Sequence, residues 1–199
     1  DEYPNGEESD SFDASAVHFA ALDGTGNVLG SVRLVQHTPE FGFPYQEHCR
    51  NLFPGAKELP VENAAEISRL VVSKSNLRRL EDRDTDFIDA TRTEHSSFVE
   101  SERRSSPSCQ GIVLGLYKAM YQHCLDVGIT HWYAAMERSL VRLLARHGVS
   151  FSPIGPVTDY FGPVIPHCVS LTSLQSSVGR LSAQLLDWFN DPEPDLSND

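Results

Sequence analysis

The chain has 199 residues, a formal net charge of −12 at pH 7 and a hydrophobic content of 40%. This length is enough for one domain with a sizeable core, the negative charge argues against a general nucleic-acid binder, and no apolar run approaches the roughly 20 residues of a transmembrane helix. The cysteines are too widely spaced to indicate a zinc or redox site, so we expect reduced thiols, no metal and a cytoplasmic protein. They are Cys49, Cys109, Cys124 and Cys168.

Two apolar runs near the beginning of the chain predict a β-hairpin. The runs at residues 16–22 and 28–35 are separated by residues 23–27, where glycine and asparagine tolerate the positive φ of a tight turn. The acidic residues 1–13 are expected to form a solvated loop before the hairpin. Arg33 interrupts the second apolar run, and it either lies on a solvated face or pairs with a carboxylate across the sheet.

The stretch at residues 64–73 predicts a strand that carries three polar side chains within four residues. Its aliphatic residues favour a packed strand, but Glu66, Ser68 and Arg69 interrupt them. Burying an unpaired ion costs several kcal/mol or more, so Glu66 and Arg69 are either a structural ion pair or part of a site. The preceding residues, 36–63, contain prolines and glycines that exclude a long helix and predict a functional or mobile loop.

A basic cluster follows this strand in an otherwise acidic chain. It is either the solvated start of a helix or a docking patch for an anionic group or an acidic partner. After it, residues 84–108 are rich in serine, threonine, glutamate and arginine, and they predict a mobile loop. The basic residues considered for docking are Lys74, Arg78 and Arg79.

The second half of the chain alternates between amphipathic and apolar segments. An apolar stripe at helical spacing predicts a helix between Pro107 and Gly128, on which His123 is expected to be a satisfied core histidine. The segments expected after it are a strand at 129–136, a helix at 137–147 ending at Gly148, short strands at 149–156 and 168–171, and a helix at about 173–189. We therefore expect one α/β (α+β) domain over residues 1–189, with a mixed sheet flanked by helices, and a disordered acidic tail at 190–199.

Four stretches of the chain carry a family resemblance. They are Glu8-x-Asp10-x-Phe12-Asp13 followed by His18, Gly30-Ser31-Val32-Arg33-Leu34, Glu66-Ile67-Ser68-Arg69-Leu70-Val71-Val72, and the segment from Ala134 to Pro156. In this order and spacing they resemble the PEP-CTERM/exosortase system-associated acyltransferases. These proteins are relatives of the N-acyl amino acid synthases and of the acyl-homoserine-lactone synthases, all with a GNAT-like fold, so the resemblance implies a mixed and mostly antiparallel sheet.

The resemblance also implies an activity. It implies the transfer of a long-chain acyl group from an acyl-carrier-protein thioester to the amine of an amino acid or a related small molecule. No bound cofactor is implied, because acyl-phosphopantetheine or acyl-CoA enters as a substrate. Glu66 is then the base and Arg69 organises the neighbouring carboxylates, with Ser68 between them. The residues implied for the amine side are Asp10, Asp13 and Arg33.

The chemistry of thioester aminolysis agrees with these assignments. The amine needs a base within hydrogen-bond reach, the developing oxyanion needs donors such as backbone N–H groups, and the donor's phosphate and an acidic carrier protein need positive charge. Glu66 can supply the base, while the end of its strand and the basic cluster can supply the rest. The residues expected to bind the acyl donor are Leu70, Val71, Val72, Lys74, Arg78 and Arg79.

Several alternatives stay open. The acidic and basic residues named above can instead form a structural cluster that closes one sheet edge. A signal synthase that makes an acyl lactone requires a pocket for S-adenosylmethionine, and a non-catalytic module would only bind acylated carrier protein or lipid. The glycine-rich phosphate loop of acetyl-CoA-dependent GNAT enzymes is missing, which weakens the case for CoA and favours a donor held partly by side-chain charge. Cys49 and Cys168 lack an activating context, so direct attack by the amine is simpler than a covalent intermediate.

Overall fold

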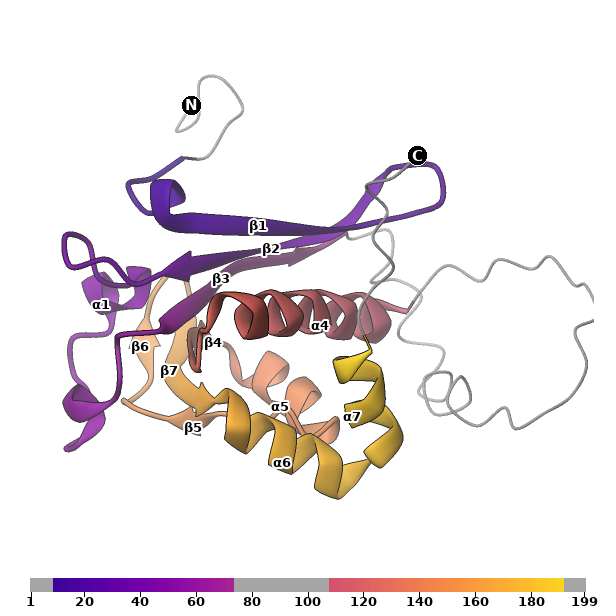
Figure 1. Ribbon diagram of the computed structural model, residues 1–199. Helices are drawn as coiled ribbons and strands as arrows, with labels where there is room; N and C mark the ends of the chain where they lie inside the picture. Colours follow the sequence, from indigo (N-terminus) through magenta and orange to yellow (C-terminus); the bar gives the residue numbers. More distant parts are fainter. Residues whose placement is uncertain (1–8, 74–107, 192–199) are drawn as a thin grey trace, which may run out of the picture.

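The computed structural model describes residues 9–73 and 108–191, and Figure 1 shows how they are arranged. Its sheet has seven strands in the order β1-β2-β3-β4-β7-β5, with β6 paired to β7 beside this path. Only the pair of β3 and β4 is parallel, so the sheet is mixed and mostly antiparallel as expected. The strands are β1 (Ala16–Leu22), β2 (Val28–Gln36), β3 (Ala64–Val72), β4 (His131–Met136), β5 (Ser152–Pro153), β6 (Thr158–Asp159) and β7 (Pro163–Ser170).

Strands β1 and β2 form the predicted hairpin. The carboxylate of Asp23 accepts hydrogen bonds from the backbone amides of Thr25 and Asn27, which closes the turn. Gly26 adopts a φ of 85° in this turn, a conformation that glycine reaches without steric cost. In the resulting register His18 lies opposite Arg33.

Strand β3 parts from its parallel neighbour β4 after three residue pairs. These pairs join the segment from Ala64 to Glu66 with the segment from His131 to Tyr133. Beyond Glu66, β3 continues to Val72 and β4 continues to Met136, but the two strands are no longer paired. Within residues 9–73 and 108–191, the edge of β3 that faces β4 therefore has no strand partner from Ile67 onwards.

Helices cover one face of this sheet (Figure 1). The longest, α4 (Cys109–Val127), begins where the Ser108 hydroxyl accepts a hydrogen bond from a backbone amide, and it ends at Gly128 with a φ of 78°. Tyr117 of α4 packs edge-on against Trp132 of β4, with 5.9 Å between ring centroids. The other helices of this core are α5 (Arg138–Arg146), α6 (Leu171–Leu181) and α7 (Ala183–Asn190).

Short helices and loops cover the opposite face. The chain between β2 and β3 forms α1 (Pro44–His48) and a 3-10 turn, η2 (Ala56–Glu58), so the expected absence of a long helix there is confirmed. Tyr45 of α1 stacks on Tyr133 of β4, with 5.6 Å between ring centroids. Because neighbouring strand residues point to opposite faces, Ile67 joins the helical core while Glu66 faces the side of α1.

The C-terminal half differs from expectation in three elements. The last strand, β7, begins at Pro163 rather than at residue 168. Residues 149–156 contain strand structure only at β5. The helix expected at 173–189 is two helices, because Ser182 is extended and its hydroxyl accepts a hydrogen bond from the amide of Leu185 to start α7.

One residue of α4 also departs from expectation. The ring of His123 packs edge-on against Phe19, with 5.7 Å between centroids. Its buried Nε2 has no hydrogen-bond partner within residues 9–73 and 108–191, so the expectation of a satisfied core histidine is not met there. Most of the expected loop at 84–108 and of the tail at 190–199 falls outside the described residues.

Candidate functional site

Glu66 is a buried carboxyl group in the middle of the sheet. Its side chain is 1% exposed, and one of its oxygens accepts a hydrogen bond of 2.9 Å from the backbone amide of Tyr45. Burial raises the pKa of Glu66 to about 8, although the Tyr45 amide and the charge of Arg33 oppose the shift. Near neutral pH this carboxyl group is therefore largely protonated, and a small rise in pH converts it into a base.

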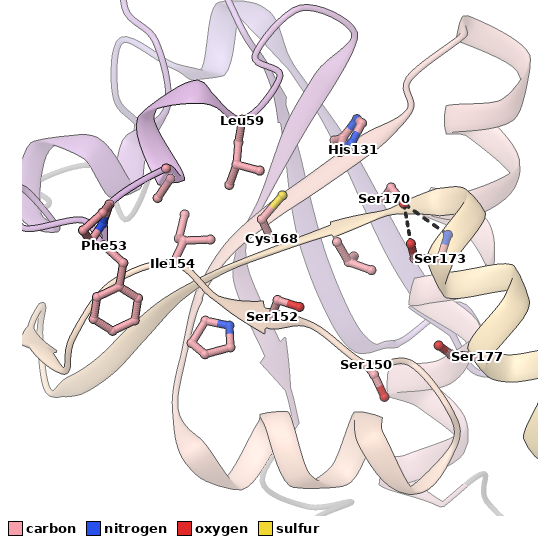
Figure 2. Close-up of a pocket in the computed structure, with 15 residues that line it drawn as sticks. Phe53, Leu59, His131, Ser150, Ser152, Ile154, Cys168, Ser170, Ser173 and Ser177 are labelled. Atoms are coloured by element: carbon pink, nitrogen blue, oxygen red, sulfur yellow. Dashed lines mark hydrogen bonds between the residues drawn. The ribbon is translucent and has the colours of Figure 1, made fainter.

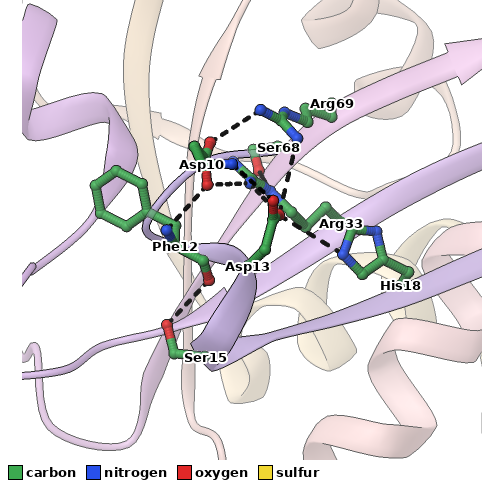
Figure 3. A network of polar contacts seen from close by, with 8 residues as sticks. All are labelled: Asp10, Phe12, Asp13, Ser15, His18, Arg33, Ser68 and Arg69. Atoms are coloured by element: carbon green, nitrogen blue, oxygen red, sulfur yellow. Dashed lines mark hydrogen bonds and ion pairs between the residues drawn. The ribbon is translucent and has the colours of Figure 1, made fainter. Parts of the chain in front are cut away.

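Arg33 holds two carboxylates in front of the sheet (Figure 3). Its Nη1 donates to Oδ1 of Asp10 at 2.8 Å and to Oδ1 of Asp13 at 2.7 Å. Its Nε donates to the Ser68 hydroxyl at 3.0 Å, across the β2–β3 pairing that places the two residues opposite each other. Arg33 is only 2% exposed, so pairing with carboxylates, and not a solvated face, accounts for its place in an apolar strand.

The two aspartates are fixed by the loop that leads into β1. The amide of Asp10 donates to Oδ2 of Asp13, and the amide of Phe12 donates to Oδ1 of Asp10. Phe12 itself is buried and anchors this loop. Burial would raise the pKa of Asp13, but the Asp10 amide and the guanidinium groups of Arg33 and Arg69 outweigh it and hold that pKa below its ordinary value. Both aspartates therefore lie in a network of opposite charges.

Arg69 completes the network from a bulge in β3. Between the pairs Ser31–Val71 and Arg33–Ser68 the β3 strand contains one extra residue. At this bulge Arg69 has a φ of 52°, which disfavours every residue except glycine by about 1–2 kcal/mol. The conformation directs its Nη2 to Oδ2 of Asp10 at 2.9 Å, and its Nη1 lies 3.7 Å from Oδ1 of Asp13.

These residues surround a cavity of about 470 Å³. Glu66 faces the same cavity as Asp10 and Arg33, which is the arrangement that the proposed site requires. The cavity also touches Ala135 of β4, so it opens where β3 and β4 separate. The sequence-predicted residues that line it are Asp10, Arg33, Glu66, Ser68 and Arg69, and Asp13 joins them through Arg33.

The residues expected to bind the acyl donor are placed differently. Leu70, Val71 and Val72 follow the bulge along β3 and do not line the cavity, and Val71 is 59% exposed. The basic residues Lys74, Arg78 and Arg79 lie outside the described residues.

The cavity also contains side chains that the sequence did not indicate. Glu47 and His48 come from α1, and Tyr160 and Phe161 come from the turn between β6 and β7. They are remote from Glu66 in sequence, and only the folding of two irregular segments brings them to it. The turn signal at Tyr160-Phe161-Gly162 marks a loop in the sequence but not which strand lies beneath it.

A second cavity, of about 540 Å³, lies beside β5 and β7 (Figure 2). Its lining includes Phe53, Leu59, Ile154 and several serines, and it shares no lining residue with the first cavity. Cys168 faces it, but burial raises the pKa of this thiol to about 11, with a partly compensating hydrogen bond at Tyr133. A thiol with this pKa is a poor nucleophile near neutral pH.

The described residues contain neither a metal site nor a membrane-spanning helix. Within residues 9–73 and 108–191 no three His, Cys, Asp or Glu side chains are grouped to hold a metal ion. None of the helices in that part of the chain is long and apolar enough to cross a membrane.

Comparisons with known proteins agree with this architecture. A family model described as an acetyltransferase (GNAT) domain matches residues 1–82. No curated protein matches the chain by sequence.

Solved structures of acyl-transferring enzymes are similar in fold. BjaI, a CoA-dependent acyl-homoserine lactone synthase solved with SAM and isopentyl-CoA, aligns with a TM-score of 0.54 at 20% identity, covering 94% of this chain and 80% of BjaI. FeeM, an N-acyl amino acid synthase from uncultured soil microbes, aligns with a TM-score of 0.53 at 14% identity over 85% of this chain and 75% of FeeM. The acyl-homoserine lactone synthase LasI aligns with a TM-score of 0.55 at 18% identity over 85% and 75% of the two chains. The expected GNAT fold in a single domain is confirmed, and the domain match supports the prediction of an acyltransferase.

Proposed function

We propose that the protein is an N-acyltransferase that moves a long-chain acyl group from an acyl-carrier-protein thioester to the amine of an amino acid or a related small molecule. The observation that carries this proposal is Glu66, a buried carboxyl group with a pKa of about 8 that faces a cavity. A base for an ammonium nucleophile works best when its own pKa lies near the working pH.

The separation of β3 and β4 supports a route for the thioester. The cavity is lined by Ile67, Ser68 and Arg69 on one strand and by Ala135 on the other. An extended pantetheine arm can lie between strands that have parted, where its amide groups can pair with free backbone groups. The thioester carbonyl then reaches Glu66 from the side of the opening, and the amine approaches from the side of Asp10.

The ammonium group of the acceptor first releases one proton to solvent, which leaves a free amine, and the transfer itself then moves one more proton. The amine nitrogen attacks the thioester carbonyl carbon and loses a proton to Glu66, directly or through a water. The C–N bond forms, the tetrahedral intermediate collapses and the C–S bond breaks. The departing pantetheine thiolate takes up the proton from Glu66, which restores the carboxylate. The proposed donors to the oxyanion are backbone N–H groups of β3 beyond Glu66, where the pairing with β4 has ended.

The test is a thiol-release assay. Purified protein is incubated with a long-chain acyl carrier protein and a panel of amines, the free carrier thiol is measured, and the acylated amine is identified by mass spectrometry. Glu66→Gln keeps the size of the side chain and removes the base. If no amine stimulates thiol release, or if Glu66→Gln is as active as the wild type, the proposal fails.

The donor needs its own comparison. The proposal names the carrier protein, for which Lys74, Arg78 and Arg79 are the expected docking residues. BjaI is CoA-dependent, so acyl-CoA of the same chain length is the matched second donor. A higher kcat/KM with acyl-CoA would reject the carrier protein while leaving the transferase proposal intact.

The fold similarity to BjaI and LasI favours a second candidate, an acyl-lactone signal synthase. Adding S-adenosylmethionine as the only amine distinguishes it, since release of an acyl lactone would replace the first proposal. Binding of acyl carrier protein without turnover on any amine would instead indicate a non-catalytic module. We include in the first proposal a cytoplasmic location and the association with the PEP-CTERM/exosortase system that the resemblance implies.

A further inference from the structure

Three aromatic rings that do not belong to the aspartate loop line the cavity at Glu66. His48 of α1 stacks on Tyr160, with 3.9 Å between ring centroids and 15° between ring planes. Phe161 follows in the β6–β7 turn, with its ring centroid 5.5 Å from that of Tyr160 and 6.1 Å from that of His48. All three residues line the cavity that contains Glu66. We refer to His48, Tyr160 and Phe161 as the ring cluster.

Phe161 is in a position that does not serve the stability of the fold. Its side chain is 98% exposed, so it buries almost no apolar surface. Its φ is 53°, a left-handed conformation that disfavours residues with a Cβ atom. The hairpin itself is closed by other groups, since the Tyr160 amide donates to the Gly162 carbonyl and the Gly162 amide donates to Asp159. A strained and exposed aromatic side chain beside a cavity points to a role in binding.

The charge around the cavity indicates the kind of ligand. Asp10, Glu47 and Glu66 line it, whereas its guanidinium groups, Arg33 and Arg69, are each ion-paired with an aspartate. Because Asp10 is neutralised by these arginines and Glu66 is largely protonated near neutral pH, Glu47 is the carboxylate of the described lining that is left to attract a cation. Aromatic faces beside carboxylates attract organic cations, because the ring quadrupole and the negative charge act in the same direction.

The Tyr160 ring belongs to the same electrostatic environment. Burial raises the pKa of its hydroxyl, and the negative charges of Glu66, Glu47 and Asp10 add to the rise against the opposing effect of Arg33. Tyr160 and these carboxyl groups line one cavity, so one small molecule can contact both.

We propose that the ring cluster binds a planar group of the acceptor, and that the acceptor is an organic cation whose amine lies toward Glu66 while its ring packs on Tyr160 and Phe161. This inference rests on the proposed function for the role of the ligand as acceptor. It narrows the acceptor from any amine to amines that carry an aromatic or other planar substituent.

Equilibrium binding of three probes tests the proposal without any acyl donor. Phenethylamine has both the ring and the charge, propylamine has only the charge, and 2-phenylethanol has only the ring. By calorimetric titration we expect phenethylamine to bind about tenfold more tightly than either of the others. Equal affinity of phenethylamine and propylamine, equal affinity of phenethylamine and 2-phenylethanol, or no binding of any probe would each overturn the proposal.

Two variants test which side chains cause the expected differences in affinity between the probes. Phe161→Gly should bring the affinity ratio of phenethylamine to propylamine down to about two or less, and because glycine favours the φ of this position its melting temperature should be equal to or above that of the wild type. Glu47→Gln should lower the affinity ratio of phenethylamine to 2-phenylethanol. Phe53→Ala is the matched control, since Phe53 is 45% exposed and lines the second cavity instead. An unchanged ring-to-no-ring ratio in Phe161→Gly, or an equal loss in Phe53→Ala, would contradict the assignment.

The binding result and the transferase result can fail separately. If phenethylamine binds as expected but no amine stimulates thiol release from either donor, the proposed function fails and the cation site stands. If amines without a planar group are acylated with the same kcat/KM as phenethylamine, the proposed function stands and the ring cluster has no part in acceptor choice.

Discussion

The side chain of Glu66 shows how one position on a strand can be both costly and useful. A carboxyl group buried in the sheet loses its hydration, and the single amide of Tyr45 replaces only part of it. Arg33 is the nearest stabilising charge, but its guanidinium is already bound to Asp10 and Asp13. The result is a proton held until the pH approaches 8, which agrees with a base that must act on an ammonium group.

Removing this base should lower the rate of acyl transfer, and the wild-type rate should depend on the pH at which Glu66 loses its proton. In Glu66→Gln we expect kcat/KM for acyl transfer to fall by roughly 10²–10⁴, the usual contribution of a general base. In the wild type, kcat/KM should rise with pH and level off above about pH 8, because the deprotonated form of Glu66 is the active one. Thiol release measured from pH 6 to pH 9.5 checks this, and a wild-type profile that is flat over this range would rule out Glu66 as the base.

The same Glu66→Gln variant, which should lose activity, is expected to gain stability relative to the wild type as pH rises. The folded pKa of about 8 lies above the ordinary value of 4.5, so between these values the folded protein holds a proton that the unfolded chain has released. The free energy of unfolding of the wild type should therefore fall as pH rises through this window. Glutamine has no such proton and can still accept the Tyr45 amide. In urea unfolding, the free energy of unfolding of Glu66→Gln should gain roughly 2–4 kcal/mol relative to that of the wild type between pH 5 and pH 8. If the free energies of unfolding of the two proteins change with pH in parallel, the raised pKa is contradicted.

Replacing Arg33 measures how much the charged network stabilises the fold. In Arg33→Met the apolar stem is kept, but Asp10 and Asp13 lose their main partner while they are only 32% and 25% exposed. Breaking a fully buried pair costs about 3–5 kcal/mol, and the partial exposure of the aspartates lowers our expectation to about 2–3 kcal/mol. The control is Arg142→Met on the exposed face of α5, which should change the free energy of unfolding by less than about 0.5 kcal/mol. Equal effects of the two variants in urea unfolding would show that the network is not stabilising.

The bulge in β3 is the element on which the site depends. A regular strand would alternate its side chains, so that Ser68 and Arg69 would face opposite sides of the sheet. The extra residue and the φ of 52° at Arg69 let both reach the aspartate network. The bulge also lies just past the point where β3 leaves β4, so the irregular backbone and the opening coincide.

The cost of this bulge can be measured with two variants of one residue. Arg69→Ala and Arg69→Gly both remove the ion pair with Asp10, but only alanine keeps a Cβ atom in the left-handed conformation. Glycine gains from the relief of strain and loses from greater freedom of the unfolded chain, so we expect Arg69→Gly to be more stable by up to about 1 kcal/mol. If Arg69→Ala is the more stable of the two in thermal unfolding, the bulge is not strained.

Two glycines at helix ends separate conformational strain from close packing. Gly128 ends α4 and Gly148 follows α5, with φ values of 78° and 76°. A Cβ atom on Gly128 would meet nothing within 4 Å, whereas one on Gly148 would lie 2.8 Å from the Cα of Val178 in α6. We expect Gly128→Ala to cost about 1 kcal/mol and Gly148→Ala to cost about 2–4 kcal/mol, because backbone must also move. Equal losses in urea unfolding would mean that α5 and α6 can move apart freely.

For the molecule as a whole, the two faces of the sheet have different tasks. The face covered by α4, α5, α6 and α7 holds the larger core, with Trp132 and Tyr117 among its fully buried side chains. The face covered by α1 and the β6–β7 turn (Figure 1) has a smaller core, and it holds the cavity at Glu66. The larger core thus lies on one side and the proposed site lies on the other, where short segments can differ without loss of the core.

Much of the fold followed from local patterns. The Asp23–Asn27 turn, the long helix ending at Gly128 and the helix before Gly148 each depend on a few adjacent residues, and each was predicted. The break at Ser182 was missed because the apolar periodicity continues on both sides of it, and only the packing of α6 and α7 against α4 requires the chain to turn there.

The charged strand at 64–73 separates what the sequence determined from what the tertiary structure decided. The sequence by itself determined that Glu66 and Arg69 were either a structural ion pair or part of a site, because an unpaired ion on an apolar strand is costly. The family resemblance added Asp10, Asp13 and Arg33 as their neighbours. The tertiary structure alone decided that Arg33 is shared between both aspartates, that a bulge brings Arg69 to them, and that α1 and the β6–β7 turn enclose Glu66 with His48, Tyr160 and Phe161. The physical reason is that burial and distance depend on segments far apart in the chain, and the pKa of Glu66 is set by those segments rather than by its neighbours in sequence.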